Sequence, residues 1–472
     1  MSTHSQTIAQ PDPKRWKALA LLGFANFIVM MDSAVVQVAL PSIKGALGYT
    51  EANLQWVMNA FLILFGGLLL LGGKLSDLFG HRRIFMWGVS ILTVSSLFAG
   101  LAWNEMSLNI GRAIQGVGSA LIAPSALSIV MILFSANKKE MGKALAIWGL
   151  SGAAGGALGI VLGGVLTQLL SWRWTLLFYV PVGIIVLLLA PKLLQKYMPK
   201  TGRIDYAGAI AITAALVLIV YGIVNVEHNG WQALSTIIPL GIGVVLFIFF
   251  ILIQVFRKDP LVSLSIFKTP NLAAGNISLI LLSASWFPLI YFLILYLQQV
   301  LKFEPFKAAM GMLPAPILMA IFMIVLAERV MNKLGMKITM MIGFIILGIA
   351  GILFSNNTIN GNYWGDVFIA LLLAALGNAL AYLPATTAAV SEAKSEESGL
   401  ASGLYNTTYQ IGSAVGLAIM VSIAAAIASS TAGNPVVVLN EGYQQAFFWS
   451  GMVAFAGAVL ALLFVRSSKQ GE

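Results

Sequence analysis

Two charged residues lie inside stretches that are otherwise apolar, and they are the strongest candidates for chemistry in this chain. Asp32 follows the largely apolar segment 18–31, and Arg112 lies within the apolar segment 107–133. A carboxylate surrounded by hydrocarbon is costly unless it is paired, hydrated or protonated. The position of Asp32 therefore predicts a buried polar pathway in which this carboxylate gains and loses a proton, with Arg112 as its partner in proton coupling.

The two charged residues are expected at comparable depths in a membrane. If a helix begins near residue 16, Asp32 lies about 24 Å along it, because each residue adds 1.5 Å. Arg112 comes only a few residues into a helix that starts on the opposite side, at a depth of about 7 to 8 Å. The side chains could meet or share a network, with Arg112 acting through water or in only one conformation. Two simpler interpretations stay open: Arg112 extends to the outer membrane surface, or Asp32 is paired only for structure.

The elements that position these residues are membrane-spanning helices. Of the 472 residues, 59% are hydrophobic and 9% are charged, whereas soluble proteins contain about 25% charged residues. Apolar segments of about 20 residues, enough to cross a bilayer, recur along nearly the whole chain. We therefore expect an all-α polytopic membrane protein with fourteen transmembrane helices. The expected helices span residues 16–40, 53–73, 84–103, 107–133, 144–170, 174–194, 205–226, 235–256, 271–300, 306–328, 337–355, 365–390, 400–429 and 443–466.

Basic residues are distributed unevenly between the loops on the two sides of the membrane. With both termini placed in the cytoplasm, only four of the 27 lysine and arginine residues fall in outer loops, namely Lys44, Arg173, Lys302 and Lys307. Cytoplasmic loops carry such an excess of positive charge, so we expect a multi-pass protein of the cell (inner or plasma) membrane with cytoplasmic termini. Loops facing anionic lipid explain the net charge of +10 without a nucleic-acid partner. We expect a monomer in the lipid bilayer.

Several other kinds of function are disfavoured by composition. The chain has no cysteine and three histidines, so we expect no metal site and no cofactor. The segment Gly72-Gly73-Lys74-Leu75 lacks the Ser or Thr that follows lysine in a phosphate-binding loop. No segment gathers a nucleophile, a base and an orienting group, which argues against an enzyme. Any work that the protein does must draw on an ion or solute gradient.

The short loop 73–83 combines glycine, acidic and basic residues between two apolar spans. Gly73 and Gly80 permit a tight link between helices, and Asp77 can cap a helix or pair with Arg82 or Arg83. This cluster is expected to act as a conformational gate that holds the cytoplasmic ends of two helices together. The alternative is an ordinary positively charged cytoplasmic loop.

A weaker copy of that loop occurs at residues 327–337, where Gly335 takes the place of Gly80. The two glycines are about 50 residues further apart than two six-helix halves require, which matches two inserted helices. We therefore expect an N-terminal six-helix bundle at 1–200, two inserted linker helices at 201–258 and a C-terminal six-helix bundle at 259–472.

Every fourth residue of one expected helix is glycine, at positions 155, 159 and 163, and a further glycine follows at 164. Such a stripe lets a neighbouring helix approach closely. Gly155, Gly159, Gly163 and Gly164 could serve packing alone or an antiporter-specific role.

Candidate substrate contacts are aromatic or hydrogen-bonding residues inside the expected helices, a mixture that suits amphipathic small molecules. Each of them could instead only bond to a neighbouring helix. These candidates are Gln55, Asn59, Phe61, Trp286, Tyr291, Tyr382, Asn406 and Gln410.

Several of these motifs occur in an order typical of one family. Residues 73–83 resemble the signature loop between helices two and three of the major facilitator superfamily. Residues 31–41 resemble the first-helix motif of its fourteen-helix drug:proton antiporter family, and residues 111–118 and 155–174 resemble the motifs in and after helices four and five. The resemblance covers nearly the whole chain. It implies two six-helix bundles plus two inserted helices, and proton-coupled efflux of hydrophobic or cationic small molecules by alternating access.

The sequence departs from the family pattern at several places. Ile160 occupies the position of the usual helix-five proline, Gln37 replaces a usual asparagine, and Leu78 and His81 stand where basic residues are common. Tyr409 stands where arginine is frequent. The change at Ile160 leaves room for a proton symporter or uniporter of a specific metabolite. A non-transporting membrane receptor or scaffold is a further alternative, although it would not need Asp32 and Arg112.

Overall fold

The computed structural model describes residues 14–135, 137–196, 204–257, 259–390, 398–430 and 433–466. Nearly all of these residues are helical, and none of them lies in a strand. Thirteen helical segments in the described residues are long and apolar enough to cross a membrane, and Pro305–Ile321 is a shorter apolar segment. The expected all-α polytopic architecture is therefore confirmed.

The helices fall into three consecutive sets. The N-terminal helices are α1 (Arg15–Leu47), α2 (Glu51–Leu54), α3 (Trp56–Phe79), α4 (His81–Gly100), α5 (Glu105–Phe134), α6 (Lys138–Leu169), α7 (Trp174–Leu177) and α8 (Tyr179–Leu193). The next pair is α9 (Tyr206–Asn229) and α10 (Leu234–Phe256). The C-terminal helices are α11 (Leu272–Leu295), α12 (Pro305–Met312), α13 (Pro314–Ile321), α14 (Ala327–Phe354), α15 (Ile369–Val390), α16 (Ser398–Ser430) and α17 (Pro435–Phe464).

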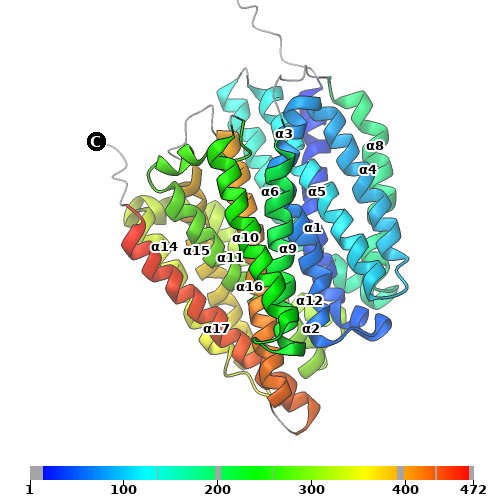
Figure 1. Cartoon of the computed structure of the whole chain (residues 1–472), viewed down its shortest axis with the longest axis vertical. Coiled ribbons are helices and arrows are strands. Elements are labelled where there is room, and N and C mark those ends of the chain that lie inside the picture. Colours follow the sequence, from blue (N-terminus) through cyan, green and yellow to red (C-terminus); the bar gives the residue numbers. More distant parts are fainter. Residues whose placement is uncertain are drawn as a thin grey trace, which may run out of the picture.

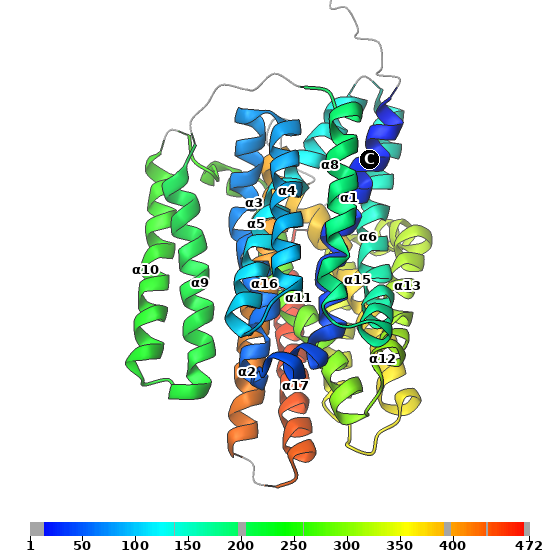
Figure 2. The same cartoon turned by 90° about the vertical axis from the view of Figure 1, so that its right-hand side faces the viewer.

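The long helices run roughly along the long axis of the molecule (Figures 1 and 2). The first turn of α1 and the last turn of α17 lie toward the same end in both views, which we call the terminal end. The opposite end, where α1 meets α2, is called the distal end. The pair α9 and α10 stands at one side of the molecule, next to α3, and α6, α12 and α13 stand at the opposite side (Figure 2).

The expected helix 306–328 is divided in the structure. Residues Pro305–Met312 and Pro314–Ile321 form α12 and α13, and a π-helical turn follows at Phe322–Leu326. Proline lacks the backbone N–H that continues a helix, so Pro314 begins a new helix at this point. Short π-helical turns of this kind interrupt helices locally.

The two similar loops share an unusual backbone conformation. Gly80 between α3 and α4 has φ 93°, and Gly335, at a bend inside α14, has φ 76°. Residues with a side chain rarely adopt positive φ. The two similar segments, 73–83 and 327–337, therefore share a position whose backbone conformation favours glycine. The expected boundaries near 200 and 258 fall on residues outside the described ranges, so the division into three parts stays a prediction.

Candidate proton and substrate site

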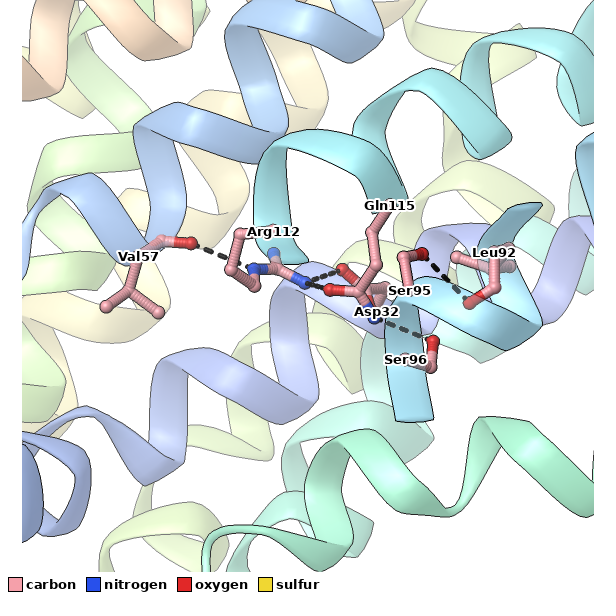
Figure 3. Close-up of polar contacts among 7 residues, drawn as sticks. All are labelled: Asp32, Val57, Leu92, Ser95, Ser96, Arg112 and Gln115. Carbon is pink, nitrogen blue, oxygen red and sulfur yellow. Dashed lines mark hydrogen bonds and ion pairs between the residues drawn. The ribbon is translucent and has the colours of Figure 1, made fainter. Parts of the chain in front are cut away.

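Helices α1 and α5 bring Asp32 and Arg112 into direct contact. The α5 helix begins with a capping box, in which Asn104 Oδ1 accepts a hydrogen bond from the Ser107 backbone at 2.8 Å. Arg112 follows on the second turn, and its Nη1 lies 2.5 Å from Asp32 Oδ2. Both side chains are fully buried (Figure 3). We expected contact through water or in one conformation only, and in this conformation the contact is direct.

Three helices hold the guanidinium of Arg112 in place. Its Nε donates to the backbone carbonyl of Val57 at 2.9 Å, and its Nη1 donates to Gln115 Oε1 at 2.8 Å. Gln115 Nε2 donates in turn to Ser96 Oγ at 2.7 Å (Figure 3). Arg112 therefore does not extend to the outer membrane surface in this conformation. The sequence analysis missed Gln115 and Ser96, although Gln115 follows Arg112 by three residues and so shares its helix face.

Phe61 completes this arrangement. The carbon of the Arg112 guanidinium lies 4.6 Å from the centre of the Phe61 ring, a cation–π geometry. Phe61 was expected to contact substrate, which stays a prediction, and the structure places it against Arg112.

Several buried polar atoms around the pair have no hydrogen-bond partner in the described part of the chain. They are Asp32 Oδ1, Arg112 Nη2 and the Tyr179 hydroxyl. Buried polar groups without partners are rare in native proteins and usually indicate bound water, an ion or a functional group. Asp32 therefore retains an acceptor oxygen that can take a proton.

The glycine stripe of α6 lies directly against the α1 backbone around Asp32. A Cβ atom added to Gly155 would lie 2.4 Å from the Phe27 carbonyl oxygen, and one added to Gly163 would lie 2.6 Å from the Val35 carbonyl oxygen. At Gly159 the added atom would lie 2.9 Å from the carbonyl oxygen of Met31, the neighbour of Asp32. These three glycines allow α6 to support the segment of α1 that carries the buried carboxylate. The α6 helix packs this closely against α1 although Ile160, and not the proline usual in the family, follows Gly159.

Gly164 faces a different helix. A Cβ atom at Gly164 would lie 2.7 Å from Ala309 Cβ of α12, so this glycine packs against the C-terminal helices. Close by, Gln168 Nε2 donates to Glu304 Oε2 at 2.7 Å, and Gln168 Oε1 accepts from the Phe306 backbone at 3.0 Å. We call this contact between α6 and α12 the α6–α12 seam. It lies at the distal end of α6.

A second contact between the N-terminal and C-terminal helices joins α3 to α16, and we call it the α3–α16 seam. A Cβ atom added to Gly66 would lie 2.8 Å from Gln410 Cβ, and one added to Gly403 would lie 2.8 Å from Leu70 Cδ2. The α9 helix contacts both α3 and α16. A Cβ atom at Gly67 would lie 2.8 Å from Thr213 Oγ1 of α9.

Residues 73–83 were expected to form a loop, but α3 continues to Phe79, α4 begins at His81, and only Gly80 lies between them. The acidic residue of this segment pairs with histidine. Asp77 Oδ1 lies 3.8 Å from His81 Nε2, and Arg82 Nη1 donates to the Leu194 carbonyl of α8 at 3.1 Å. Arg83 is exposed.

The two glycines of that loop differ in their surroundings. Gly80 ends α3 with a positive φ, and a Cβ atom added to Gly73 would lie 3.6 Å from Pro124 of α5, which is ordinary contact. The neighbouring Gly72 is tighter, because its added Cβ would lie 2.1 Å from the Ala120 carbonyl oxygen. The sequence analysis did not single out Gly72.

The remaining substrate candidates are not all brought together. Gln55 and Asn59 are buried beside each other, with Asn59 Nδ2 donating to Gln55 Oε1 at 3.3 Å. Asn406 donates to a carbonyl of its own helix at 3.0 Å, and Gln410 lies in the α3–α16 seam. Trp286 is half-buried.

The two tyrosine candidates lie in different environments. The ring of Tyr382 lies 5.7 Å from that of Tyr409, edge to face. Tyr291 is buried, and its hydroxyl has no partner among the described residues.

Comparisons with known proteins agree with this geometry. The sequence model of the Major Facilitator Superfamily matches residues 22–417. The cephamycin export protein of Amycolatopsis lactamdurans is 35% identical over 78% of this chain and 76% of its own length. The puromycin resistance protein of Streptomyces alboniger is 34% identical over 72% of this chain and 67% of its own length.

Solved structures show the same fold at low sequence identity. A POT family transporter superposes with a TM-score of 0.70 at 17% identity, covering 95% of this chain and 97% of its own. A bacterial homologue of the human lysosomal transporter Spinster gives a TM-score of 0.67 at 16% identity, covering 96% of this chain and 97% of its own. Because the family match spans most of the chain and agrees with this helical fold, the chain belongs to the major facilitator superfamily of membrane transporters and is not an enzyme.

Proposed function

We propose that this protein is a proton-coupled antiporter that exports hydrophobic or cationic small molecules by alternating access. The observation that carries the proposal is the fully buried pair of Asp32 and Arg112, in which one carboxylate oxygen has no hydrogen-bond partner among the described residues. Relatives named as a cephamycin export protein and a puromycin resistance protein support the direction of transport and small molecules as the cargo.

Proton binding at Asp32 would change the balance of buried charge. In the conformation described here, ionised Asp32 neutralises Arg112. When Asp32 takes a proton, Arg112 becomes a buried cation without a counter-charge, which is strongly unfavourable. The guanidinium must then move or gain water, so proton binding is coupled to a structural change. A cationic substrate near Asp32 would favour loss of the proton, and the two would compete.

The α6 helix could transmit that change to the other half of the protein. Its glycines at 155, 159 and 163 contact α1 around Asp32, and Gly164 contacts α12. A shift of α1 at Asp32 is therefore passed to the α6–α12 seam through one continuous helix. In this mechanism the bundles 1–200 and 259–472 rock against each other, and 201–258 supplies the inserted helices. Residues 73–83 act as the gate at the terminal end.

We place the protein in the cell membrane as a monomer, with both termini and the terminal end in the cytoplasm. The excess of basic residues in the loops assigned to that side supports this orientation.

The proposal is tested with purified protein in lipid vesicles that contain a pH-sensitive dye. Addition of ethidium, an aromatic cation, should release protons on the opposite side in exchange for the dye. Proton movement in the same direction as the dye would instead indicate a symporter. No movement of ethidium or of a neutral dye would contradict a transport function.

The same assay tests Asp32 directly. We expect Asp32→Asn to abolish exchange, because an amide cannot bind and release the proton. Asp259→Asn is the matched control, since Asp259 is an exposed carboxylate outside the helices, and it should exchange at the wild-type rate. Active transport by Asp32→Asn against a gradient would exclude the carboxylate from proton coupling.

A further inference from the structure

One buried tyrosine of α8 has a hydroxyl group that the protein leaves unsatisfied. The side chain of Tyr179 is 1% exposed, and its hydroxyl forms no hydrogen bond with a described residue. The charges of Asp32 and Arg112 both act on this hydroxyl. Because Coulomb interactions weaken with distance, Tyr179 lies near the ion pair. It is not hydrogen-bonded to Asp32 Oδ1, which also has no partner in the described part of the chain.

A small cavity adjoins Tyr179 inside the N-terminal helices. Its wall is formed by α1, α4, α5 and α8. Ile28 of the wall comes one turn before Asp32 on α1. Leu92 of the wall comes one turn before Ser96, which belongs to the hydrogen-bonded network around the ion pair (Figure 3). The cavity is therefore next to the layer of side chains that holds the buried charges, on its terminal side.

The cavity has the size of a single water molecule. The space open to the centre of a water molecule is about 20 Å³, and about 10–15 Å³ is enough to hold one. Most of the wall is apolar, but Tyr179 and Thr93 belong to it. The Thr93 hydroxyl lies against Gly183, another residue of the wall, because a Cβ atom added there would overlap it. It donates to the Val89 carbonyl at 2.7 Å, so its oxygen can still accept a hydrogen bond.

We propose that one water molecule bound in this cavity joins the Tyr179 hydroxyl to Oδ1 of Asp32, which makes Tyr179 a positioning residue for the proton step. The inference rests on the proposed proton coupling and adds a residue to it. Buried polar groups that are near each other but not in direct contact are commonly bridged by water. The water accepts a hydrogen bond from Tyr179 and donates one to Asp32. Since this bond favours the charged carboxylate, Tyr179 sets the pH at which Asp32 binds a proton.

Arg112 is the charged group that faces this arrangement. Apart from Asp32, Arg112 and Tyr179, every titratable side chain in α1, α3, α4, α5, α6 and α8 lies within the first two or last two turns of its helix. Arg112 also acts on the Tyr49 hydroxyl, but that group donates to the Glu105 carbonyl at 2.9 Å and is therefore engaged elsewhere. The charged form of Asp32 is thus held by Arg112 at Oδ2 and by the water at Oδ1.

The test follows the protonation of Asp32 by infrared difference spectroscopy of the full-length protein in lipid nanodiscs. The carbonyl band of a protonated carboxyl group that is lost in Asp32→Asn reports this residue. We expect Tyr179→Phe to raise the midpoint of its titration by about half to one pH unit, which corresponds to one neutral hydrogen bond. Tyr443→Phe is the matched control, because Tyr443 of α17 is also buried and its hydroxyl also lacks a partner among the described residues. Its midpoint should equal that of the wild type.

A second variant displaces the water and keeps the hydroxyl group. Val186→Ile adds a methyl group to the wall of a cavity that has room for one water molecule, so the midpoint should again rise. Val182→Ile is its matched control, because it makes the same change one turn earlier on α8, at a buried residue that does not line the cavity. It should titrate like the wild type.

Several outcomes would overturn the inference. A midpoint that is unchanged or lower in Tyr179→Phe would show that the hydroxyl does not act on Asp32, even if exchange were slower at every pH. A shift in Tyr179→Phe without one in Val186→Ile would exclude the bridging water. Unchanged midpoints in a wild type that exchanges ethidium for protons would leave the proposed function intact. The expected shifts in a protein that exchanges no dye would support the water bridge and contradict the proposed function.

Discussion

The α3–α16 seam and the α6–α12 seam join the same two sets of helices in different ways. At the α3–α16 seam, Gly66 and Gly403 bring the two helices into close contact, and α9 covers both. At the α6–α12 seam, Gly164 and Gln168 meet α12 at the distal end, and α6 has fewer contacts with α13 beyond it. Added Cβ atoms at Gly142, Gly149 and Gly156 of α6 would meet nothing within 4 Å.

This difference indicates that the two seams have different roles in the conformational change. A seam that is closely packed and covered by a third helix resists separation. A seam that is closed at one end by a glycine contact and a few hydrogen bonds can open there. We therefore expect most of the movement between the two halves to occur on the side of α6.

Cross-linking provides the largest expected contrast between the two seams. The chain has no cysteine, so introduced pairs react without background. Joining Gln168→Cys to Glu304→Cys with a short bis-maleimide should abolish ethidium transport, because the α6–α12 seam can no longer open. Joining Leu70→Cys to Gly403→Cys should leave at least about half of the transport rate, since a packed seam moves little.

The unlinked double-cysteine proteins are the controls for this experiment, and transport is measured in vesicles at matched protein content. Full transport with the α6–α12 seam cross-linked would show that the halves do not separate there.

A single glycine substitution should have the next largest effect. In Gly164→Val the side chain would meet Ala309 and the α12 backbone, and overpacking of this kind costs about 1–3 kcal/mol. The distal end should open, and transport should fall by about tenfold or more, since 1.4 kcal/mol corresponds to a factor of ten. Transport rate and the accessibility of a cysteine at Glu304 are the measurements.

Gly156→Val is the matched control, because it introduces the same side chain two turns earlier on α6, where there is open space. It should transport normally. Equal defects in the two variants would assign the effect to the helix itself rather than to the seam.

Loss of a hydrogen-bonding side chain should have the smallest effect. Gln168→Ala removes the bonds to Glu304 and to the Phe306 backbone. A hydrogen bond to a charged group contributes about 1.5–3 kcal/mol at most, and exposed ones contribute less. We expect a change of severalfold in the fraction of molecules with a closed distal end, measured by the reactivity of a cysteine introduced at Ala309, which is buried in the seam and leaves Glu304 in place. An unchanged reactivity would leave Gly164 as the main contact of this seam.

The buried ion pair illustrates how far sequence analysis reaches. A charged residue within an apolar segment is conspicuous, so Asp32 and Arg112 could be singled out, and their similar depths followed from the rise of a helix. The partners of Arg112 were harder to find, because Val57 contributes only a backbone carbonyl and Phe61 was expected to contact substrate. Backbone acceptors leave no mark in a sequence.

The glycines of α6 show the same limit. Their four-residue spacing predicted a stripe that packs closely against another helix, but it did not identify α1 as that helix. Gly164 was grouped with the stripe, although adjacent residues on a helix point about 100° apart. The structure shows that it contacts α12 in the opposite half.

The amino-acid sequence alone determined the class of protein, the approximate helix positions and the two charges in the membrane interior, because each depends on the length and polarity of a local segment. The tertiary structure decided that the charges touch and that one helix supports Asp32 and also reaches the opposite half. These features depend on the rotation of each helix about its axis and on the choice of its neighbours. Helix packing sets both, and the packing energy comes from residues far apart in the chain.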